Sequence, residues 1–232
     1  MSLPRTALVI LAAGSGARVG AEINKVLLPL EGLPILVHSI RTAMQVDGVH
    51  RIVLVIRAED REAVAAAVAP HLGSHDVWVV DGGLERHDSE WQALTALRAD
   101  IEAGEIQVVA IHDAARPLAT ADLFRQIIDT AAERGAAIPV VATGQLTRRD
   151  GAAPPASGLV AVQTPQGFRA AELLDAYTRA NADGFTGTDT ASCLERYVDL
   201  PIVGVPSTPA NLKVTFPEDV ALAESLLRPT RH

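Results

Sequence analysis

The sequence predicts an α/β protein with a mostly parallel sheet and helices on both of its faces. Apolar runs rich in β-branched residues, which are typical of strands buried on both faces, alternate at least four times with stretches of helical periodicity. Such alternation calls for a parallel sheet with crossover helices. The chain has 232 residues, of which 48% are hydrophobic, so we expect a single domain over residues 1–232 with an ample core.

Each expected strand is a short, mostly apolar run of its own. They cover residues 6–11, 51–56, 77–80, 106–111 and 136–141, the last weakened by Pro139, followed by short strands at 159–162 and around Lys213. The expected helices place apolar residues at helical spacing or begin with a capping residue or a proline. They cover residues 34–46, 59–69, 86–102, 122–134, 169–181, 188–197 and 217–228.

One polar segment interrupts this pattern in the second half of the chain. Residues 144–158 have no apolar period and end in a low-complexity stretch, Gly151-Ala-Ala-Pro-Pro-Ala-Ser-Gly158. A segment of this composition cannot bury enough apolar surface to order itself alone. We therefore expect an exposed arm over residues 139–162 as an excursion within the domain.

Composition narrows the partners and the compartment. The formal net charge is -8 and no basic stripe stands out, which argues against general nucleic-acid binding but not against a local cationic pocket. Residues 6–13 are apolar, but this run is too short for a membrane span and does not resemble a signal peptide. The single cysteine, Cys193, excludes an intramolecular disulfide and favours the reducing cytoplasm.

A loop of small residues follows the first expected strand. Its backbone N–H groups can form an anion-binding nest, and its short side chains let a ligand approach closely. A dinucleotide fingerprint fails on spacing, because Gly20 lies four positions after the second glycine, and the Gly-Lys-Ser/Thr of a P-loop is absent. A plain strand-terminating turn remains the alternative. The candidate nucleotide-binding residues of this loop are Ala12, Ala13, Gly14, Ser15 and Gly16.

Two cations follow the small residues of this loop. Arg18 lies within it and Lys25 comes seven residues later. Nucleotidyl transfer needs cations that hold a triphosphate and offset the charge that develops on the α-phosphate and on the departing pyrophosphate. Either residue alone would be read as solvated surface, but an arginine and a lysine beside an anion nest favour the catalytic interpretation.

An aspartate follows another expected strand. The motif Ile111-His-Asp-Ala-Ala-Arg-Pro117 places Asp113 at the carboxyl end of that strand, where open α/β sheets bind ligands. A carboxylate opposite a cationic phosphate loop is a natural Mg²⁺ ligand. Arg116 is close enough in sequence to contact an anionic substrate, whereas we expect His112 to be a hydrogen-bonded neighbour with no role of its own.

The remaining motifs carry weaker signals. Asp81-Gly-Gly-Leu-Glu-Arg-His-Asp-Ser-Glu90 joins a strand to a helix, and its glycines and Ser89 can read a base edge. Three distal motifs are Gln163-Thr-Pro-Gln-Gly-Phe168, Thr188-Asp-Thr-Ala-Ser192 and Asn211-Leu-Lys-Val-Thr215. Each of these has an ordinary structural explanation, such as a helix cap at Thr188 or Asp189.

The ordered set of motifs resembles the 2-C-methyl-D-erythritol 4-phosphate cytidylyltransferase family over about residues 6–227. The resemblance implies a Rossmann-like nucleotidyltransferase fold and a homodimer formed through its protruding arms. It also implies an enzyme of non-mevalonate isoprenoid biosynthesis, with CTP and Mg²⁺ as ligands and CDP-methylerythritol and pyrophosphate as products. We expect the partners to be the small-molecule substrates, CTP and a polyol phosphate, with no nucleic acid and no membrane.

The resemblance also implies roles for individual residues. The small-residue loop holds the triphosphate, and Arg18 and Lys25 stabilise the transition state. Asp113 binds Mg²⁺, while Gly83 and Ser89 lie at the cytosine. The residues that match those holding or orienting the methylerythritol phosphate are Arg116, Thr143, Thr188 and Lys213.

The sequence departs from the family pattern in several places. Leu11 replaces a frequent proline before the loop, and Asn24-Lys-Val26 replaces Pro-Lys-Gln while keeping the lysine. In the arm, Ala142-Thr-Gly-Gln145 replaces Asp-Thr-Ile-Lys, and Ala156 stands where an arginine is expected. Arg148 or Arg149 is the candidate replacement for that arginine.

Two alternatives remain open at this point. A cytidylyltransferase for ribitol 5-phosphate or another polyol phosphate would share the loop, Lys25 and Asp113 and differ in the arm. A non-catalytic nucleotide-binding module is the alternative from another class, but binding alone has little need for transition-state cations.

Overall fold

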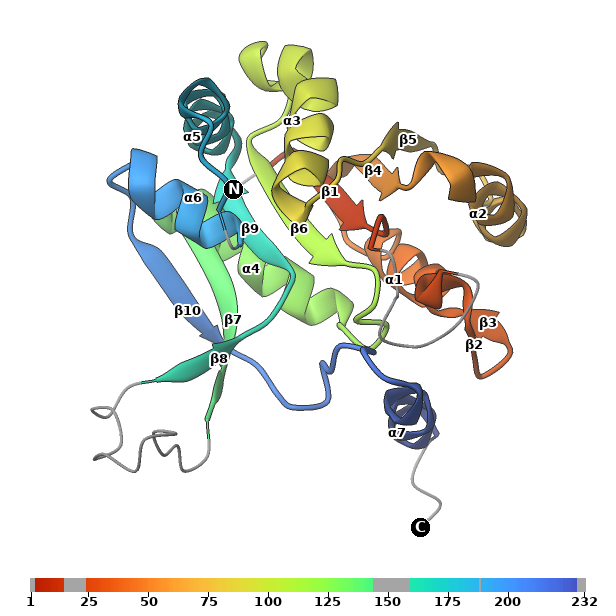
Figure 1. Ribbon diagram of the computed structural model, residues 1–232. Coiled ribbons are helices and arrows are strands. Elements are labelled where there is room, and N and C mark those ends of the chain that lie inside the picture. The colour runs from red at the N-terminus through yellow and green to blue at the C-terminus, as the bar shows by residue number, and fades with distance from the viewer. Residues whose placement is uncertain (1–2, 15–23, 144–158, 188, 229–232) are drawn as a thin grey trace.

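The computed structural model describes residues 3–14, 24–143, 159–187 and 189–228, and in this part of the chain one mixed sheet carries helices on both faces (Figure 1). The order of the strands is β10-β7-β9-β6-β1-β4-β5, with β8 paired to β7. Of these, β8 and β9 are antiparallel to their neighbours and the other pairings are parallel. The strands are β1 (Thr6–Leu11), β4 (Val49–Ile56), β5 (Val77–Asp81), β6 (Val108–Asp113), β7 (Ala136–Ala142), β8 (Val160–Val162), β9 (Gln166–Arg169) and β10 (Ile202–Pro206).

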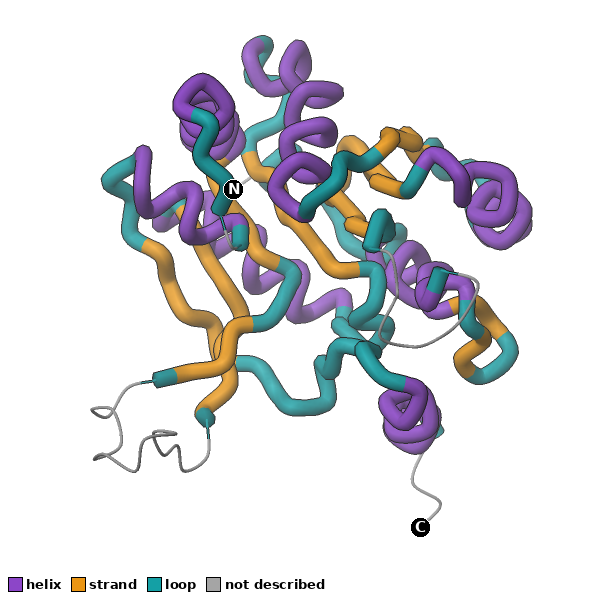
Figure 2. Tube along the Cα trace, viewed as in Figure 1, coloured by secondary structure: helices purple, strands orange, loops and turns teal. Residues whose placement is uncertain are grey.

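Two helical layers cover this sheet (Figure 2). One face packs against α1 (Ile35–Ala43), α2 (Arg61–Val68) and α4 (Ala121–Arg134). The other face packs against α3 (Arg86–Glu102), α5 (Ala170–Asp183) and α6 (Thr190–Tyr197). The predicted fold class, a mostly parallel sheet with helices on both faces, is therefore confirmed.

A smaller cluster lies beside the main sheet. The hairpin of β2 (Pro29–Leu30) and β3 (Leu33–Pro34) packs against α7 (Pro217–Leu227). Leu30, Ile35, Val214 and Ala223 form its buried core. This cluster joins the C-terminal helix to the segment that carries Lys25, so both ends of the chain contribute to the same region of the molecule.

Strand β1 shows why a continuous apolar run is needed at the centre of the sheet. Leu8 and Ile10 pack into one helical layer and Ala7 and Val9 into the other, and each is fully buried. Successive side chains of this strand point to opposite faces of the sheet, and they are apolar on both faces, as the sequence predicted. The helix expected at 86–102 has those bounds, and the other expected helices differ by a few residues at their ends.

Some of the expected element bounds are wrong. The strand expected at 106–111 begins and ends two residues later, as β6, so that Asp113 is its last residue. No strand forms around Lys213, because this segment has a single backbone bond to the rest of the fold, from Val214 N to Ala115 O at 2.8 Å, instead of a ladder. Strands β9 and β10 were not expected.

The base of the arm is a pair of antiparallel strands. Val140 pairs with Val162 and Ala142 with Val160, and Thr143 Oγ1 donates to Leu159 O at 3.0 Å. Residues 144–158 lie outside the described part of the chain, so the predicted course of the arm stays an expectation. Within the described ranges, no helix has the length and apolar character needed to cross a membrane.

The sheet topology places four strand ends side by side. The chain moves from β1 outward through β4 to β5, and then returns to add β6 on the other side of β1. The carboxyl ends of β5, β4, β1 and β6 are therefore neighbours, and the direction of winding changes between β1 and β6. Open α/β sheets bind their ligands at this kind of crevice.

Candidate active site

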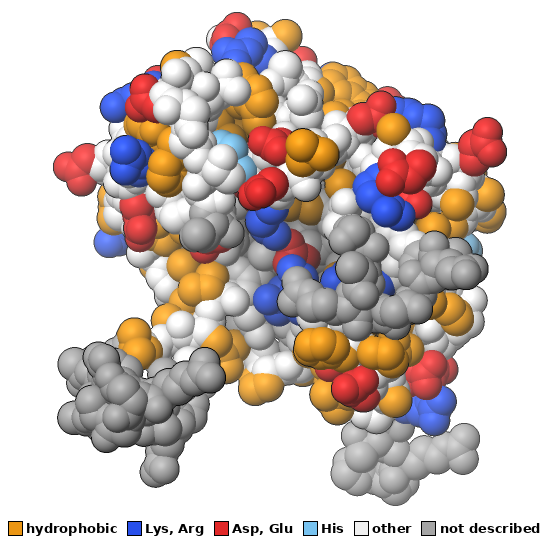
Figure 3. Space-filling model, in the orientation of Figure 1, with side chains coloured by type: hydrophobic (Ala, Val, Ile, Leu, Met, Phe, Trp, Pro, Cys, Tyr) orange, Lys and Arg blue, Asp and Glu red, His pale blue; other side chains and the backbone are white. Residues whose placement is uncertain are grey.

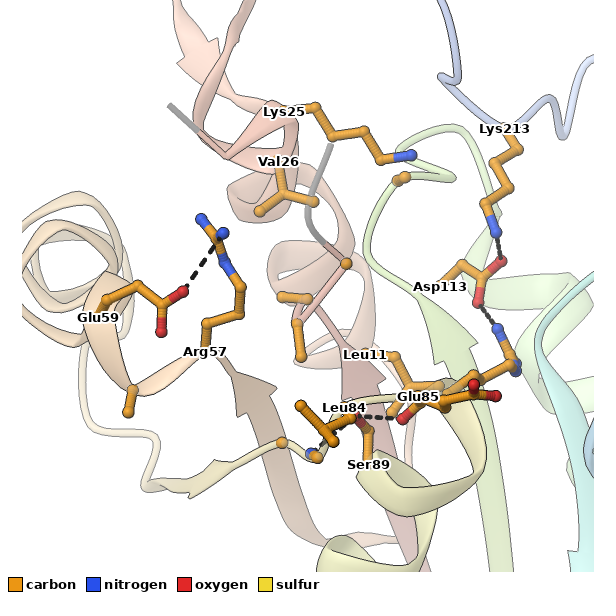
Figure 4. Close-up of a pocket in the computed structure, with 18 of the residues that line it drawn as sticks. Leu11, Lys25, Val26, Arg57, Glu59, Leu84, Glu85, Ser89, Asp113 and Lys213 are labelled. Atoms are coloured by element: carbon orange, nitrogen blue, oxygen red, sulfur yellow. Dashed lines mark hydrogen bonds and ion pairs between the residues drawn. The ribbon is translucent and has the colours of Figure 1, made fainter. Parts of the chain in front are cut away.

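A cavity of about 890 Å³ lies at these strand ends. Its walls come from the loop after β1, the segments after β4 and β5, the first turn of α3, the end of β6 and the stretch before α7 (Figure 4). The charged residues of its lining are Lys25, Arg57, Glu59, Glu85, Arg86, Asp113 and Lys213. On the face of the molecule that is turned toward the viewer, acidic and basic side chains lie next to one another near the centre (Figure 3).

The backbone of the cavity wall depends on a close approach of two loops. Ala12 N donates to Val55 O and Gly82 N donates to Ile56 O, both at 2.7 Å, which extends the sheet bonding past the strand ends. A Cβ atom at Gly82 would lie 2.6 Å from the Cβ atom of Ala13. Glycine is therefore required for the loop after β5 to lie against the small-residue loop.

Ser89 ties the next residue of that loop to α3. Its Oγ accepts from Gly83 N at 3.2 Å and donates to Glu85 O at 3.1 Å. Glu85 and Asp88 form a capping box that begins the helix. Gly83 and Ser89, the two residues expected at a base, are thus fixed side by side on the cavity wall.

Lys25 is held at the cavity by its neighbour Asn24. The Asn24 amide is buried, with 1% of the residue exposed, and donates to Ala12 O at 2.9 Å and to Asp60 Oδ2 at 2.8 Å. Its oxygen accepts from Val26 N at 3.2 Å and caps the 3-10 helix Lys25–Leu27. The departure from proline at position 24 therefore has a structural role, because this amide joins the lysine segment to two other walls.

Arg57 is a cavity residue that the sequence interpretation missed. Its guanidinium donates to both oxygens of Asp60, from Nε at 2.7 Å and from Nη2 at 2.9 Å. Burial alone would raise the pKa of Asp60, but the hydrogen bonds from Arg57 and Asn24 outweigh it and lower that pKa. Arg57 directly follows strand β4, so the strand-end argument used for Asp113 would have found it.

Asp113 lies between two cations on the opposite side of the cavity (Figure 4). Lys213 Nζ donates to its Oδ2 at 2.6 Å, and Arg86 Nη1 donates to its Oδ1. Burial would raise the pKa of this carboxyl, but the charges of Arg86 and Lys213 outweigh it and hold the pKa well below its usual range. Asp113 is therefore ionised at neutral pH.

The backbone of Asp113 is fixed by a buried polar chain. Asp113 N donates to Thr164 Oγ1 at 3.0 Å, and Thr164 Oγ1 lies 3.1 Å from His112 Nδ1. His112 Nε2 lies 3.2 Å from Arg116 O. Burial lowers the pKa of His112 to about 4, so the ring is neutral at neutral pH, and these partners require the tautomer with the proton on Nε2. His112 thus has the supporting place that was expected for it.

Arg116 lies behind Asp113 instead of lining the cavity. Its Nη1 donates to Asn211 O at 2.8 Å, and its Nε lies 3.9 Å from Asp113 Oδ2. The Nε atom is buried and has no hydrogen-bond partner among the described residues. Burial lowers the pKa of Arg116. Its expected contact with the acceptor stays a prediction.

The cavity brings together most of the candidate residues that the structure describes. Those that line it are Ala12, Ala13, Gly14, Lys25, Gly83, Ser89, Asp113 and Lys213. Thr143 does not, since it lies at the base of the arm. Ser15, Gly16, Arg18 and Thr188 lie outside the described residues. Arg86 belongs to a motif that the sequence interpretation quoted, but it was given no role there.

The donor set bears on the implied metal. No cluster of three or more His, Cys, Asp or Glu side chains occurs in the described ranges, so a metal held by protein ligands alone has no support there. Mg²⁺ usually keeps several waters and is bound by one or two carboxylates together with substrate phosphates. The ionised carboxylate of Asp113 fits a metal of this second kind.

The fold and the position of this cavity define a Rossmann-like nucleotidyltransferase. The solved structure of 4-diphosphocytidyl-2C-methyl-D-erythritol synthase from Anaerococcus prevotii matches with a TM-score of 0.81 at 26% identity, covering 97% of each chain. A 2-C-methyl-D-erythritol 4-phosphate cytidylyltransferase structure from Thermus thermophilus matches with a TM-score of 0.72 at 24% identity, covering 97% of this chain and 98% of that chain.

Sequence relatives identify the family. A 2-C-methyl-D-erythritol 4-phosphate cytidylyltransferase from Symbiobacterium thermophilum is 44% identical over 225 residues, which cover 94% of this chain and 91% of the relative. One from Solibacter usitatus is 40% identical over 240 residues, with 97% and 96% covered. Residues 6–229 match the IspD family, 2-C-methyl-D-erythritol 4-phosphate cytidylyltransferase. This chain belongs to that family.

The contacts of Asn24 lead to a prediction about stability. Asn24→Ala removes two donors from buried acceptors, and we expect a loss of about 1–3 kcal/mol in the free energy of unfolding. Asn24→Asp keeps the shape but sets a carboxylate against Asp60, so it should be at least as destabilising. Thermal or urea unfolding measures both variants, and a wild-type stability for Asn24→Asp would contradict the role given to this amide.

Proposed function

We propose that this chain transfers CMP from CTP to 2-C-methyl-D-erythritol 4-phosphate and releases pyrophosphate. Its membership in the family supports this reaction and makes the chain an enzyme, so a non-catalytic binding module is no longer an alternative. The observation that carries the proposal is the cavity itself, in which the small-residue loop, Lys25 and the pair of Asp113 and Lys213 face one space.

The chemistry needs no nucleophile from the protein. An oxygen of the acceptor phosphate attacks the α-phosphorus of CTP, a new phosphorus–oxygen bond forms, and the bond to the β-phosphate oxygen breaks. Pyrophosphate leaves with the electron pair of that bond. Lys25, together with Arg18, offsets the charge that grows on the α-phosphate oxygens and on the leaving group.

Different walls of the cavity contact different parts of the nucleotide in this proposal. The backbone N–H groups of residues 13–16 hold the triphosphate, because small side chains leave them accessible, while the N–H of Ala12 is bonded to Val55 O. Gly83 and Ser89 contact the cytosine from the wall at the start of α3. Arg57 adds a cation to the same cavity, on the side away from Asp113 (Figure 4).

Asp113 is the residue that holds Mg²⁺ in this proposal. When bound, the metal neutralises phosphate charge and orients the triphosphate. In the described structure both carboxylate oxygens of Asp113 already accept from cations, Arg86 and Lys213. Those two groups keep the carboxylate ionised, and Lys213 itself lines the cavity.

The acceptor side involves the second subunit. We propose a homodimer in which the arms reach across the interface, with Thr143 of one chain contributing to the site of the other. Arg116, Thr188 and Lys213 hold or orient the acceptor phosphate within one chain.

The buried thiol of Cys193 and the absence of any second cysteine in the sequence fit the cytoplasm as the compartment of this enzyme.

The sequence of the arm supports a second candidate acceptor. Ala156 cannot supply the guanidinium expected at its position, and Ala142-Thr-Gly-Gln145 differs from the family pattern. A ribitol 5-phosphate cytidylyltransferase would share the nucleotide half of the site. Arg148 or Arg149 could supply the missing cation for either acceptor.

Purified protein given CTP, Mg²⁺ and a panel of polyol phosphates tests the substrate assignment. We expect pyrophosphate release with 2-C-methyl-D-erythritol 4-phosphate at a kcat/KM at least about tenfold above that with ribitol 5-phosphate, the scale of one charged contact. The measurement is a coupled pyrophosphate assay. A preference for ribitol 5-phosphate would move the assignment to the second candidate.

Lys25 and Arg18 should act mainly in the transition state. We expect Lys25→Ala and Arg18→Ala each to lower kcat by roughly a hundredfold, the scale of losing one charged stabiliser. Folding should be retained, which circular dichroism and thermal unfolding can check, because Lys25 is not part of the apolar core and arginine side chains such as that of Arg18 rarely contribute to one. Near-normal turnover by either folded variant would show that the lost cation has no transition-state role.

Asp113→Asn keeps the shape of the side chain and removes its charge. We expect a higher Mg²⁺ concentration for half-maximal turnover and a loss of about tenfold or more in kcat/KM. Because the pKa of Asp113 is lowered, its stabilising ion pairs are complete above the ordinary carboxylate pKa and are lost only as the pH falls through the lower folded value. Wild-type turnover at low Mg²⁺ would exclude the metal role.

A further inference from the structure

A second buried carboxylate lies behind the ion pair of Asp113. Glu90, one turn after the start of α3, is 1% exposed. Its Oε1 accepts from Arg86 Nε at 2.9 Å and from Thr190 Oγ1 at 2.7 Å, and its Oε2 accepts from Tyr177 OH. These three hydrogen bonds all come from donors, and Thr190 and Tyr177 are themselves fully buried. Burial nevertheless raises the pKa of Glu90.

These contacts determine where the Arg86 guanidinium points. Arg86 Nε is bound to Glu90 and its Nη1 to Asp113, so the planar fork lies between the two carboxylates. The side chain is 29% exposed and also lines the cavity. A guanidinium held at Nε and Nη1 presents its remaining N–H groups in one direction, whereas without Glu90 only the contact with Asp113 would restrain it.

The same helical turn also contacts Gly187 and the start of α6. Thr190, in the first turn of α6, donates to Glu90 Oε1. Gly187 N donates to His87 Nδ1 at 3.4 Å. The His87 ring stacks on the Tyr177 ring, with centroids 4.6 Å apart and planes at 15°. Residues 86–90 therefore contact both the end of β6 and the start of α6.

We propose that Glu90 is a positioning residue for nucleotidyl transfer, which acts by orienting Arg86 against Asp113. Arg86 is then a further catalytic residue, whose guanidinium contacts the phosphates of the bound substrates. The inference rests on the proposed function for the identity of those substrates. It gives roles to Arg86 and Glu90 that the motif interpretation left without any.

The test compares two variants that each remove one partner from the same buried cluster. Glu90→Leu removes the acceptor of Arg86 at similar volume. Tyr177→Phe, the matched control, removes one donor to Glu90 and leaves the contact between Glu90 and Arg86 in place. We expect kcat/KM for CTP to fall about tenfold or more in Glu90→Leu, the scale of one hydrogen bond to a charged group, and less than about twofold in Tyr177→Phe. Glu90→Gln, which keeps an acceptor oxygen, should recover much of the loss.

A double-mutant cycle separates positioning from general stability. In the Arg86→Ala background, the effect of Glu90→Leu on kcat/KM should disappear, because the residue through which it acts is gone. Additive losses, or equal losses in Glu90→Leu and Tyr177→Phe at matched stability, would overturn the proposal.

If Glu90→Leu does not fold, Arg86→Lys is compared with Arg98→Lys on the same helix, whose partner Glu102 is exposed. Equal kcat/KM values for Arg86→Lys and Arg98→Lys would also overturn the proposal.

The design also separates this inference from the assignment of the acceptor. Wild-type turnover with the polyol phosphate panel is measured first, and its absence would count against the proposed function alone. Equilibrium binding of CTP in the presence of Mg²⁺, measured by calorimetry, needs no acceptor. Weaker binding by Glu90→Leu than by Tyr177→Phe would support the positioning role, and equal binding together with equal turnover would contradict it.

Discussion

The site depends on the ion pairs that the carboxylate of Asp113 forms with Arg86 and Lys213. This carboxylate occupies the last position of β6, where it is buried, and it remains ionised because Arg86 and Lys213 contact its two oxygens. These cations come from the start of α3 and from the stretch before α7, which are far apart in the sequence. One carboxylate thus sets the relative positions of three segments, and removing its charge would leave two cations facing each other.

The sequence predicted those parts of the fold in which local pattern and tertiary environment agree. The run Thr6–Leu11 is apolar on both sides because β1 lies in the middle of the sheet, and α3 has the bounds that its pattern indicated. Strand β9 was missed because its four residues, Gln166–Arg169, have no strand-like pattern. It forms because β6 and β7 hold it from both sides.

The candidate site was predicted as far as strand ends and motifs allow. Asp113, Lys25 and the small-residue loop lie at one cavity, as expected, but no pattern in one sequence brings Lys213 within 2.6 Å of Asp113. The burial of Glu90 could not be predicted, since a glutamate in the first turns of a helix usually faces solvent. Arg57 is different, because the rule that found Asp113 applies to it equally.

The place of β9 in the sheet has a consequence for the order in which the protein is assembled. Strands β1, β4, β5 and β6 all lie within the first 113 residues and are neighbours in the sheet, in the order β6-β1-β4-β5, so this half can form during synthesis before the rest has emerged. The N–H group of Asp113, however, finds its acceptor only at Thr164, just before β9, and the carboxylate meets Lys213 later still. This half of the sheet, whose strand ends line the cavity, is thus built early from strands near one another in the sequence, while completion of the charged centre waits for contacts of high sequence separation, the slow class of events in folding.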